Sequence, residues 1–273
     1  MTGQALAPRA RRVLGNRSPV TGVFDATEAY PDLNVEQAMN EILAFEGIFS
    51  RRQIQGAGLK VRFGRLLPQA LRSELRIGLT NLMEIFEKRK AKTNASPIRL
   101  HLGCGNIIKK DFVNVDLWGL PQIDVAWNLG HTPLPWVTNS VDLVFHEHVQ
   151  EHMTQMKGLA LARDVFRVLR PGGVYRFAVP DPALHYAAYG DGANDFFARF
   201  MTFAVDIDAM NQLHYGERHV HMYDQYGGTR LLVAAGFRQI NVCAPAQSGF
   251  LDPESVPDTE WRAINSLYFE ARK

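Results

Sequence analysis

The chain has few cysteines, no long apolar run and little net charge, and each shortage excludes a class of protein. Its 273 residues include two cysteines, Cys104 and Cys243, which are too few for a disulfide scaffold, so we expect a reducing, cytoplasmic setting. No apolar run reaches the length that a bilayer requires, so the sequence predicts no membrane span. The 30 basic and 28 acidic residues leave a formal charge of +2, which gives no general attraction to nucleic acid.

The first part of the chain lacks a regular pattern and then turns helical. Residues 1–30 mix Gly, Pro, Ala and Arg without periodicity or the apolar core of a signal peptide, and we interpret them as a mobile arm. Residues 31–95 show helical spacing of apolar residues after Asn34, which suits a helix N-cap. We expect this segment to be a helical extension or lid on a main domain of residues 96–273.

The main domain also lacks a glycine that a dinucleotide-binding fold requires. The apolar run from Ile98 ends in Gly103-Cys104-Gly105, which predicts a buried strand and then a sharp turn that a ligand can approach closely. Ile108 stands where the third glycine of a dinucleotide site would be, and an acid, Asp116, ends the next strand earlier than in such a site. A nicotinamide oxidoreductase is therefore disfavoured.

The tight glycine loop and the early acid resemble motifs of class I S-adenosylmethionine (SAM) methyltransferases. Further matches follow in order, namely a "SVDLV" strand, Glu151-His152 and the turn Arg170-Pro171-Gly172-Gly173. The resemblance covers about residues 97–273. It implies an α/β, Rossmann-like fold with a mainly parallel seven-stranded sheet, SAM as the cofactor and S-adenosylhomocysteine as its product.

The resemblance also implies which residues would hold SAM. The loop backbone would hold the methionine part, and Asp116 would accept hydrogen bonds from both ribose hydroxyls, a task that suits an acceptor-only carboxylate. Asn128 stands where the family often has an acid that meets the adenine amino group, and its carbonyl could accept the same bond. The predicted cofactor residues are Leu102, Gly103, Cys104, Gly105, Asp116, Leu117, Asn128, Leu129 and His146.

Within this class, the chain is most similar to predicted methyltransferases associated with sugar and polysaccharide assembly. The similarity rests on "LHLGCG…NVD", "HVQEH", "YGERH…MYD" and "SLYFEA". It implies an O-methyltransferase that acts on a hydroxyl of a sugar, an oligosaccharide or another small molecule. N- or O-methylation of a small natural product, and a degenerate fold that binds without catalysis, remain alternatives, and a homodimer is left open.

A sugar hydroxyl is a poor nucleophile at neutral pH, so the reaction needs a general base, and histidine suits this role. Six of the nine histidines form two groups, at 146, 148 and 152 and at 214, 219 and 221. We predict His146, His148 and Glu147 as catalytic residues, with His146 favoured because it would be the first residue after a strand. Glu147 or Glu151 would orient one of these histidines.

The second histidine group lies in a loop rich in polar and aromatic residues. Hydroxyl-rich ligands need hydrogen-bond partners and a stacking face, and this loop supplies both. A purely structural loop is the alternative. The predicted acceptor-binding residues are Tyr215, Glu217, His219, His221 and Tyr223.

The segment His148-Val-Gln-Glu151-His152 also matches the H-x-x-E-H zinc pattern. That pattern needs both histidines on one helix face and a third ligand elsewhere. Because the match follows directly from a strand and no carboxylate cluster accompanies it, we predict no metal ligands and no required metal. An Mg²⁺ ion that assists the acceptor hydroxyl stays an option.

Overall fold

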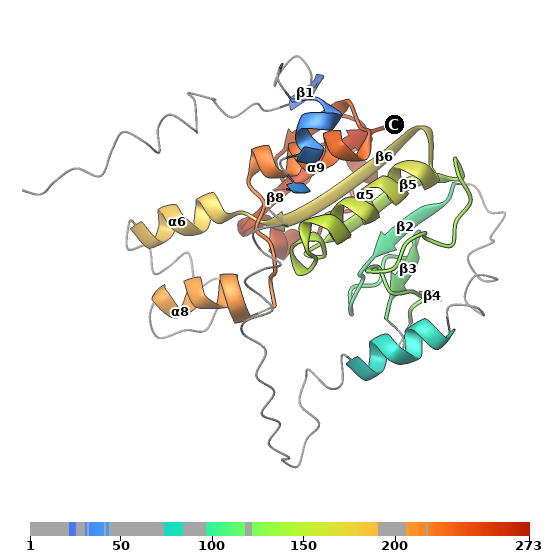
Figure 1. The fold of residues 1–273 in the computed structure, drawn as a ribbon, viewed down its shortest axis with the longest axis horizontal. Helices are drawn as coiled ribbons and strands as arrows, with labels where there is room; N and C mark the ends of the chain where they lie inside the picture. Colours follow the sequence, from blue (N-terminus) through green and yellow to red (C-terminus); the bar gives the residue numbers. More distant parts are fainter. Residues whose placement is uncertain are drawn as a thin grey trace, which may run out of the picture.

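An open, mixed sheet of eight strands organises the part of the chain that the structure describes (Figure 1). The computed structural model describes residues 22–25, 31, 33–40, 42–43, 74–83, 97–117, 122–190, 206–216 and 218–273. The strand order is β1-β7-β8-β6-β5-β2-β3-β4. The strands are β1 (Gly22–Asp25), β2 (Arg99–Leu102), β3 (Val113–Asp116), β4 (Val125–Ala126), β5 (Val141–Glu147), β6 (Leu169–Pro180), β7 (Gln239–Cys243) and β8 (Ser266–Arg272).

The order of the strands reverses beside β2, which defines where a ligand would bind. The chain runs outward from β2 through β3 to β4, and then returns to the other side of β2 with β5 and β6, all in parallel. In open α/β sheets, ligands bind outside the carboxyl ends of the strands at such a reversal. The α/β class expected from the sequence is therefore confirmed, and the site is expected at the ends of β2, β3 and β5.

The other half of the sheet is antiparallel, which corrects the expectation of a mainly parallel seven-stranded sheet. β8 lies antiparallel between β6 and β7, and β1 pairs antiparallel with β7 from Gly22↔Val242 to Asp25↔Gln239. β1 comes from the segment that the sequence assigns to a mobile arm. Four residues are too few to show a periodic pattern, and their pairing partners lie at the far end of the chain. The rest of that arm lies outside the described residues.

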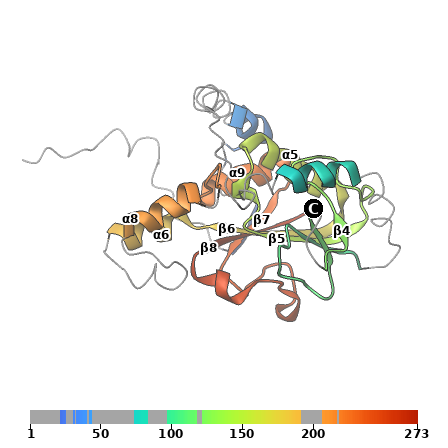
Figure 2. The same ribbon diagram turned by 90° about the horizontal axis from the view of Figure 1, so that it is seen from below.

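Helices cover one face of the sheet and an irregular loop covers the other (Figure 2). α5 (Gln155–Val168) and α9 (Gln225–Ala235) lie on the apolar face, where Gly228 of α9 lets the Phe269 ring come close. Residues 244–265, with the short helices η3 (Pro253–Ser255) and η4 (Glu260–Ile264), lie on the opposite face. None of the helices in the described ranges is long and apolar enough to cross a bilayer.

α6 and α8 form a smaller cluster beyond the carboxyl ends of the parallel strands. α6 (Pro182–Gly190) follows β6, and α8 (Asp206–Asn211) leads into a π-helical turn, η2 (Gln212–Gly216). They share a small apolar core that is separate from the main one and is made of Ala188, Ala209, Met210 and Leu213.

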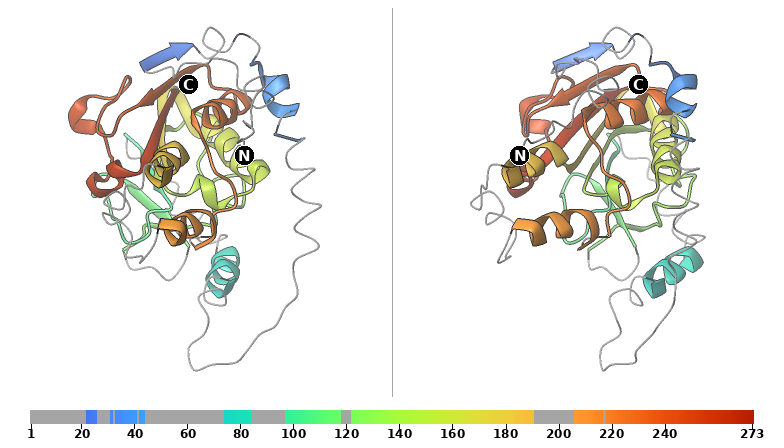
Figure 3. Two further views of the ribbon diagram at one scale, coloured as in Figure 1. Left: turned by 90° about the vertical axis from the view of Figure 1, so that its left-hand side faces the viewer. Right: turned by 60° about the vertical axis from the view of Figure 1, so that its left-hand side comes forward.

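Two helical pieces of the amino-terminal segment are described. Residues 35–40 and 42–43 are helical, and Leu33, Ala38 and Ile42 belong to the same buried cluster as the sheet. This piece is therefore part of the main core. Residues 74–83 form the second piece, the teal helix in the lower part of both views in Figure 3. The remaining residues of the expected extension lie outside the described ranges.

The Arg-Pro-Gly-Gly turn is not a separate element between a helix and a strand. α5 ends at Val168, and β6 begins directly at Leu169, so the turn residues lie within the strand. The register explains this, because Val141 pairs with Leu169 whereas Leu143 pairs with Val174. β6 therefore carries a bulge that accommodates the turn residues, with Gly172 at a φ of 80°.

Candidate functional site

The glycine loop after β2 has the sharp turn that the sequence predicts. Gly103 and Gly105 have φ values of 61° and 54°, which favour glycine. A Cβ at Gly103 would lie 2.3 Å from Cγ2 of Val149, so this glycine is required by packing. A Cβ at Gly105 would meet nothing within 4 Å. The loop thus offers bare backbone to the surrounding space at Gly105.

Asp116 joins the glycine loop at the end of β3. The Gly105 N–H donates to Oδ2 of Asp116 at 2.8 Å, and the Leu117 N–H donates to Oδ1 at 2.6 Å. A carboxylate can accept about four hydrogen bonds, so each oxygen keeps capacity for a ligand. The two motifs that the sequence singled out therefore form one continuous surface at the strand ends.

The helix of residues 74–83 reaches this surface. Arg76 donates from Nη2 to the Leu117 carbonyl at 3.1 Å and lies 3.7 Å from Oδ1 of Asp116. Asn81 accepts a hydrogen bond from Nδ2 of Asn128 at 3.1 Å. The predicted adenine contact, Oδ1 of Asn128, already accepts from the Gly130 N–H at 3.0 Å and has one acceptor position left.

The other predicted cofactor residues of this region are packed inside the domain. Leu102, Cys104 and Leu129 are buried. Burial, followed by the charge of Asp116, raises the pKa of the Cys104 thiol to about 12. Cys104 is therefore a neutral thiol at physiological pH and does not act as a nucleophile.

His146 lies in the core, which argues against the catalytic and cofactor roles that the sequence favoured for it. β5 continues to Glu147, so His146 is within the strand and does not follow it. The side chain is fully buried, with Nε2 2.7 Å from the Tyr175 hydroxyl and its ring 5.3 Å from that of Phe177. Burial, followed by the charge of His101, lowers its pKa to about 3.

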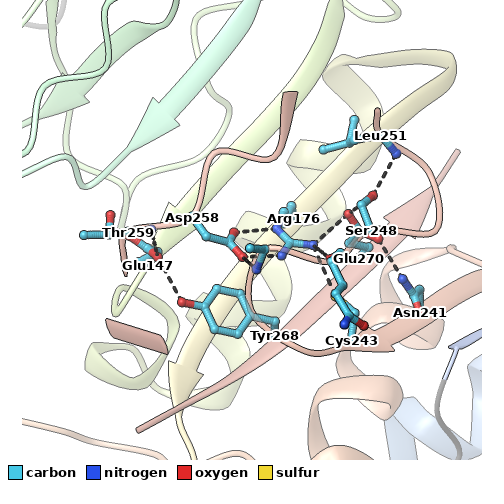
Figure 4. A network of polar contacts seen from close by, with 12 residues as sticks. Glu147, Arg176, Asn241, Cys243, Ser248, Leu251, Asp258, Thr259, Tyr268 and Glu270 are labelled. Carbon is cyan, nitrogen blue, oxygen red and sulfur yellow. Dashed lines mark hydrogen bonds and ion pairs between the residues drawn. The ribbon is translucent and has the colours of Figure 1, made fainter. Parts of the chain in front are cut away.

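Glu147 points to the opposite face of the sheet and anchors the 244–265 loop (Figure 4). Its Oε1 accepts from the Thr259 N–H at 3.0 Å and from the Tyr268 hydroxyl at 3.3 Å, and Oε2 lies 4.0 Å from Nε of Arg262. Burial raises its pKa. These contacts tie Glu147 to the loop and to β8, which argues against the expectation that it orients a catalytic histidine.

His148 is the first residue after β5 and lies where the parallel strands of the sheet end. Its Nε2 is 2.8 Å from Oγ of Ser266, and its Nδ1 is 3.4 Å from Oε1 of Glu151. Because Ser266 donates to Asn265 at 3.3 Å, we assign the ring proton to Nε2 and the lone pair to Nδ1. The side chain is 16% exposed, and burial, then Arg262 and neighbouring histidines, lowers its pKa well below 6.5.

The loop of the second histidine group returns to η1 (Gln150–His152) and joins the first group. The N–H groups of Val220 and His221 donate to the Glu151 carbonyl at 2.7 and 3.1 Å. The rings of His152 and His219 are 4.9 Å apart. Sequence reasoning did not foresee that the two groups meet, because no local pattern reports a contact between segments so far apart.

The predicted acceptor residues are only partly brought together. His219 lies at the cluster, His221 lies 2.8 Å from the amide of Gln155, and Tyr223 is buried against His221. Tyr215 is 77% exposed, and Glu217 lies outside the described residues. The main residue missing from the predicted site residues is Glu151, which sequence reasoning considered only as a group that could orient a histidine.

Burial sets Glu151 apart from ordinary surface acids. Its side chain is fully buried, and burial raises its pKa to about 8. Its sequence context, a Glu-His pair common to the class that the chain resembles, gave no sign of this environment.

The chain is distantly similar to solved structures of methyltransferases. One solved structure is a SAM dependent methyltransferase from Archaeoglobus fulgidus, with 14% identity over 76% of this chain and 100% of that chain and a TM-score of 0.42. Another is a possible histamine N-methyltransferase from Thermotoga maritima, with 11% identity, 74% and 96% coverage and a TM-score of 0.41. A putative O-methyltransferase from Nostoc punctiforme has 12% identity, 91% and 71% coverage and a TM-score of 0.41.

No family model matches the chain, and no curated protein matches it. Likeness at these identities and TM-scores carries no argument about function.

Proposed function

We propose that this chain is a SAM-dependent methyltransferase that acts on a hydroxyl group of a sugar or oligosaccharide. The observation that supports SAM as the cofactor is the hydrogen bond of 2.8 Å between the Gly105 N–H and Asp116, where the strand order reverses. It places bare loop backbone and a carboxylate with free acceptor capacity side by side. A nucleoside that carries an amino acid needs both features.

The residues fit SAM in two respects. A ligand can approach the backbone at Gly105, where a Cβ would meet no protein atom within 4 Å. Asp116 has accepted one backbone hydrogen bond on each oxygen, which leaves positions for two ribose hydroxyls. When bound, SAM supplies an activated methyl group.

We favour His148 over His146 as the general base. His146 is fully buried and bonded to Tyr175, whereas His148 is partly exposed at the strand end and keeps a lone pair on Nδ1. A base must come within hydrogen-bond reach of the proton it removes, and of these two rings His148 is the accessible one.

A groove that carries several polar side chains supports a hydroxyl-rich acceptor. A cavity of about 720 Å³ lies beside the ends of β6 and β7, at the sheet edge that also carries His148. Sugar hydroxyls require hydrogen-bond partners of both kinds, and this lining supplies carboxylates, amides and a hydroxyl. The polar side chains of the lining are Asp181, Asp224, Gln225, Asn241, Gln247 and Ser248.

The cofactor assignment is tested by calorimetry with SAM, S-adenosylhomocysteine and NAD. We expect binding of the first two, and Asp116→Ala should weaken it by roughly 2–4 kcal/mol because two hydrogen bonds to a charged acceptor are lost. Asp111→Ala, an exposed acid near the same loop, is the matched control and should bind as the wild type does. Equal SAM affinity in the Asp116 and Asp111 variants would remove the basis of the proposal.

The base is tested by turnover with simple mannosides, glucosides and nucleotide sugars as acceptors. His148→Ala should lower kcat by about 10²–10⁴-fold with little change in SAM affinity. His146→Phe should retain most of the turnover. If His146→Phe lowers kcat more than His148→Ala does in a protein that remains folded, the preference for His148 as the base is wrong.

A further inference from the structure

Three ligand-type side chains meet where η1 contacts the 218–224 loop. One potential ligand atom from each of Glu151, His152 and His219 lies within 4.8 Å of the other two. The contact is held by the main chain, because the N–H groups of Val220 and His221 donate to the Glu151 carbonyl. The grouping is therefore fixed by the fold.

The carboxylate of Glu151 lacks the hydrogen bonds that a buried acid normally has. Its side chain is fully buried, and among the described residues neither oxygen accepts a hydrogen bond. Its neighbours are nitrogen atoms of the surrounding rings, Nδ1 of His148 at 3.4 Å and Nε2 of His219 at 3.9 Å from Oε1. A buried polar group without partners is unfavourable, and a bound cation would satisfy both oxygens.

His219 has the tautomer that a metal ligand requires. Its Nδ1 is 2.5 Å from the Leu213 carbonyl, which can only accept, so we assign the proton to Nδ1. The lone pair is then on Nε2, the atom nearer to Glu151. Metal-binding histidines almost always donate their other ring N–H to a carbonyl or carboxylate in this way.

We propose that Glu151, His152 and His219 bind one divalent first-row transition metal ion of the Zn²⁺ type. Bonds of about 2.0–2.1 Å in a tetrahedral site put ligand atoms about 3.3 Å apart, so a small contraction of the cluster is sufficient. Two imidazoles favour such an ion over Mg²⁺, which prefers oxygen ligands.

Three protein ligands leave one position open, as in catalytic zinc sites. A role of that position in polarising the acceptor oxygen beside His148 rests on the proposed function, whereas metal binding itself does not.

This site differs from the H-x-x-E-H pattern read from the sequence. His148 and His152 do not share an α-helix, because His148 precedes η1 with a φ of 54° and η1 is a single 3-10 turn. The second imidazole comes instead from His219, in a distant segment of the chain.

The test measures metal content and affinity on the full chain after chelator treatment. Titration with Zn²⁺ should give one equivalent, Co²⁺ should give the visible absorption of a low-symmetry N/O site, and Mg²⁺ should not compete. Glu151→Gln, His152→Ala and His219→Ala should each weaken Zn²⁺ binding by about 100-fold or more, since loss of even an outer-shell group costs 10–100-fold. His214→Ala, in the same histidine group but bonded to Tyr186, is the matched control and should retain wild-type affinity.

The His152 variant and the SAM affinity make the result of this test unambiguous. His152 is exposed, so its variant tests the site without disturbing the core even if Glu151→Gln fails to fold. Failure of the folded wild type to bind Zn²⁺, or a smaller effect in any folded ligand variant, overturns the three-ligand site. SAM affinity measured on the same samples separates this result from the proposed function, because SAM binding without metal binding rejects only the metal site.

Discussion

At the residue scale, a single backbone torsion angle places the side chains of His146 and His148 in different environments. The two positions have the same parity, so an uninterrupted strand would turn both rings into the core. β5 ends at Glu147, however, and His148 takes a φ of 54°, a conformation that costs energy for a residue with a Cβ. His148 instead meets Ser266 and Glu151. Strained residues of this kind cluster at functional sites.

The buried ring of His146 should make stability depend on pH. Its pKa is about 3 in the folded chain, below the 6.5 of an ordinary histidine. Between pH 6.5 and 3 the unfolded chain therefore binds a proton that the folded chain does not bind. The contribution of His146 to the free energy of unfolding is therefore complete above pH 6.5. It falls by about 1.4 kcal/mol per pH unit as the pH drops from 6.5 to 3.

The measurement is denaturant unfolding of the wild type and His146→Phe at pH 8, 5.5 and 4.5. The variant should lose about 1–3 kcal/mol at pH 8, since the Tyr175 hydroxyl loses its partner, and its stability should then fall less steeply with acid. The remaining slope includes His101, whose pKa burial lowers to about 4. Parallel pH profiles for the two proteins would mean that His146 does not contribute.

The positions of the glycine loop and of Asp116 could be predicted because they depend on local geometry. Gly103 and Gly105 follow from the need for positive φ, and Asp116 follows from its place at a strand end. His146 and Glu147 were misplaced because the end of β5 lies two residues later than the apolar run suggests. An error of one or two residues at a strand end therefore assigns a side chain to the wrong face of the sheet, or to the strand end instead of the core.

At the element scale, the helix of residues 74–83 is tied to the ends of β3 and β4 rather than to the centre of the core. Arg76 contacts Leu117 and Asp116, and Asn81 contacts Asn128. These are the groups proposed for the ribose and the adenine. We therefore propose that this helix acts as a cover on the cofactor site, as the sequence led us to expect for part of residues 31–95.

Removing both contacts should release the cofactor faster. In the variant Arg76→Ala/Asn81→Ala, two exposed or half-buried hydrogen bonds are lost, each worth about 0.5–1.5 kcal/mol, so SAM should dissociate about 10-fold faster. Stopped-flow measurement of SAM release provides the rate. Leu82→Ala, on the same helix and 70% exposed, is the control. Identical release rates in all three proteins would show that the helix does not cover the site.

The elements that the sequence missed are short or depend on distant pairing. β1 has four residues whose partners lie in β7, and the bulge in β6 is visible only from its register with β5. By contrast, the parallel strands β2, β3 and β5 carry their own apolar patterns and were expected. Local patterns indicate these elements, but they do not identify an edge strand added from the opposite end of the chain.

At the scale of the whole molecule, a buried charged network fastens the 244–265 loop to the polar face of the sheet (Figure 4). Arg176, fully buried in β6, forms a two-pronged ion pair with Asp258 and a second one with Glu270 at 2.8 Å. Glu270 also accepts hydrogen bonds from Asn241 and Ser248. One side chain therefore links β6, β8 and the loop.

Replacing Arg176 should lower the free energy of unfolding strongly. Arg176→Met leaves two buried carboxylates without their cation, and breaking a buried pair in this way typically costs 3–5 kcal/mol of unfolding free energy. Arg170→Ala removes an exposed arginine that pairs with Asp142 at 2.7 Å and should cost less than about 1 kcal/mol. Denaturant unfolding compares the two variants, and equal losses would show that the buried network does not anchor the loop.

The position of β8 has a consequence for how the chain reaches its folded state during synthesis. β8 lies between β6 and β7, and β1 is attached only through β7. β1 is therefore the first described strand to leave the ribosome and yet has no place in the sheet until β8, the last described strand, has been made. Such non-local pairing is slow to form, and unpaired strands invite association between nascent chains in the meantime. Co-translational assembly is accordingly open to the parallel half of the sheet, from β2 to β6, while the antiparallel half has to wait for β8.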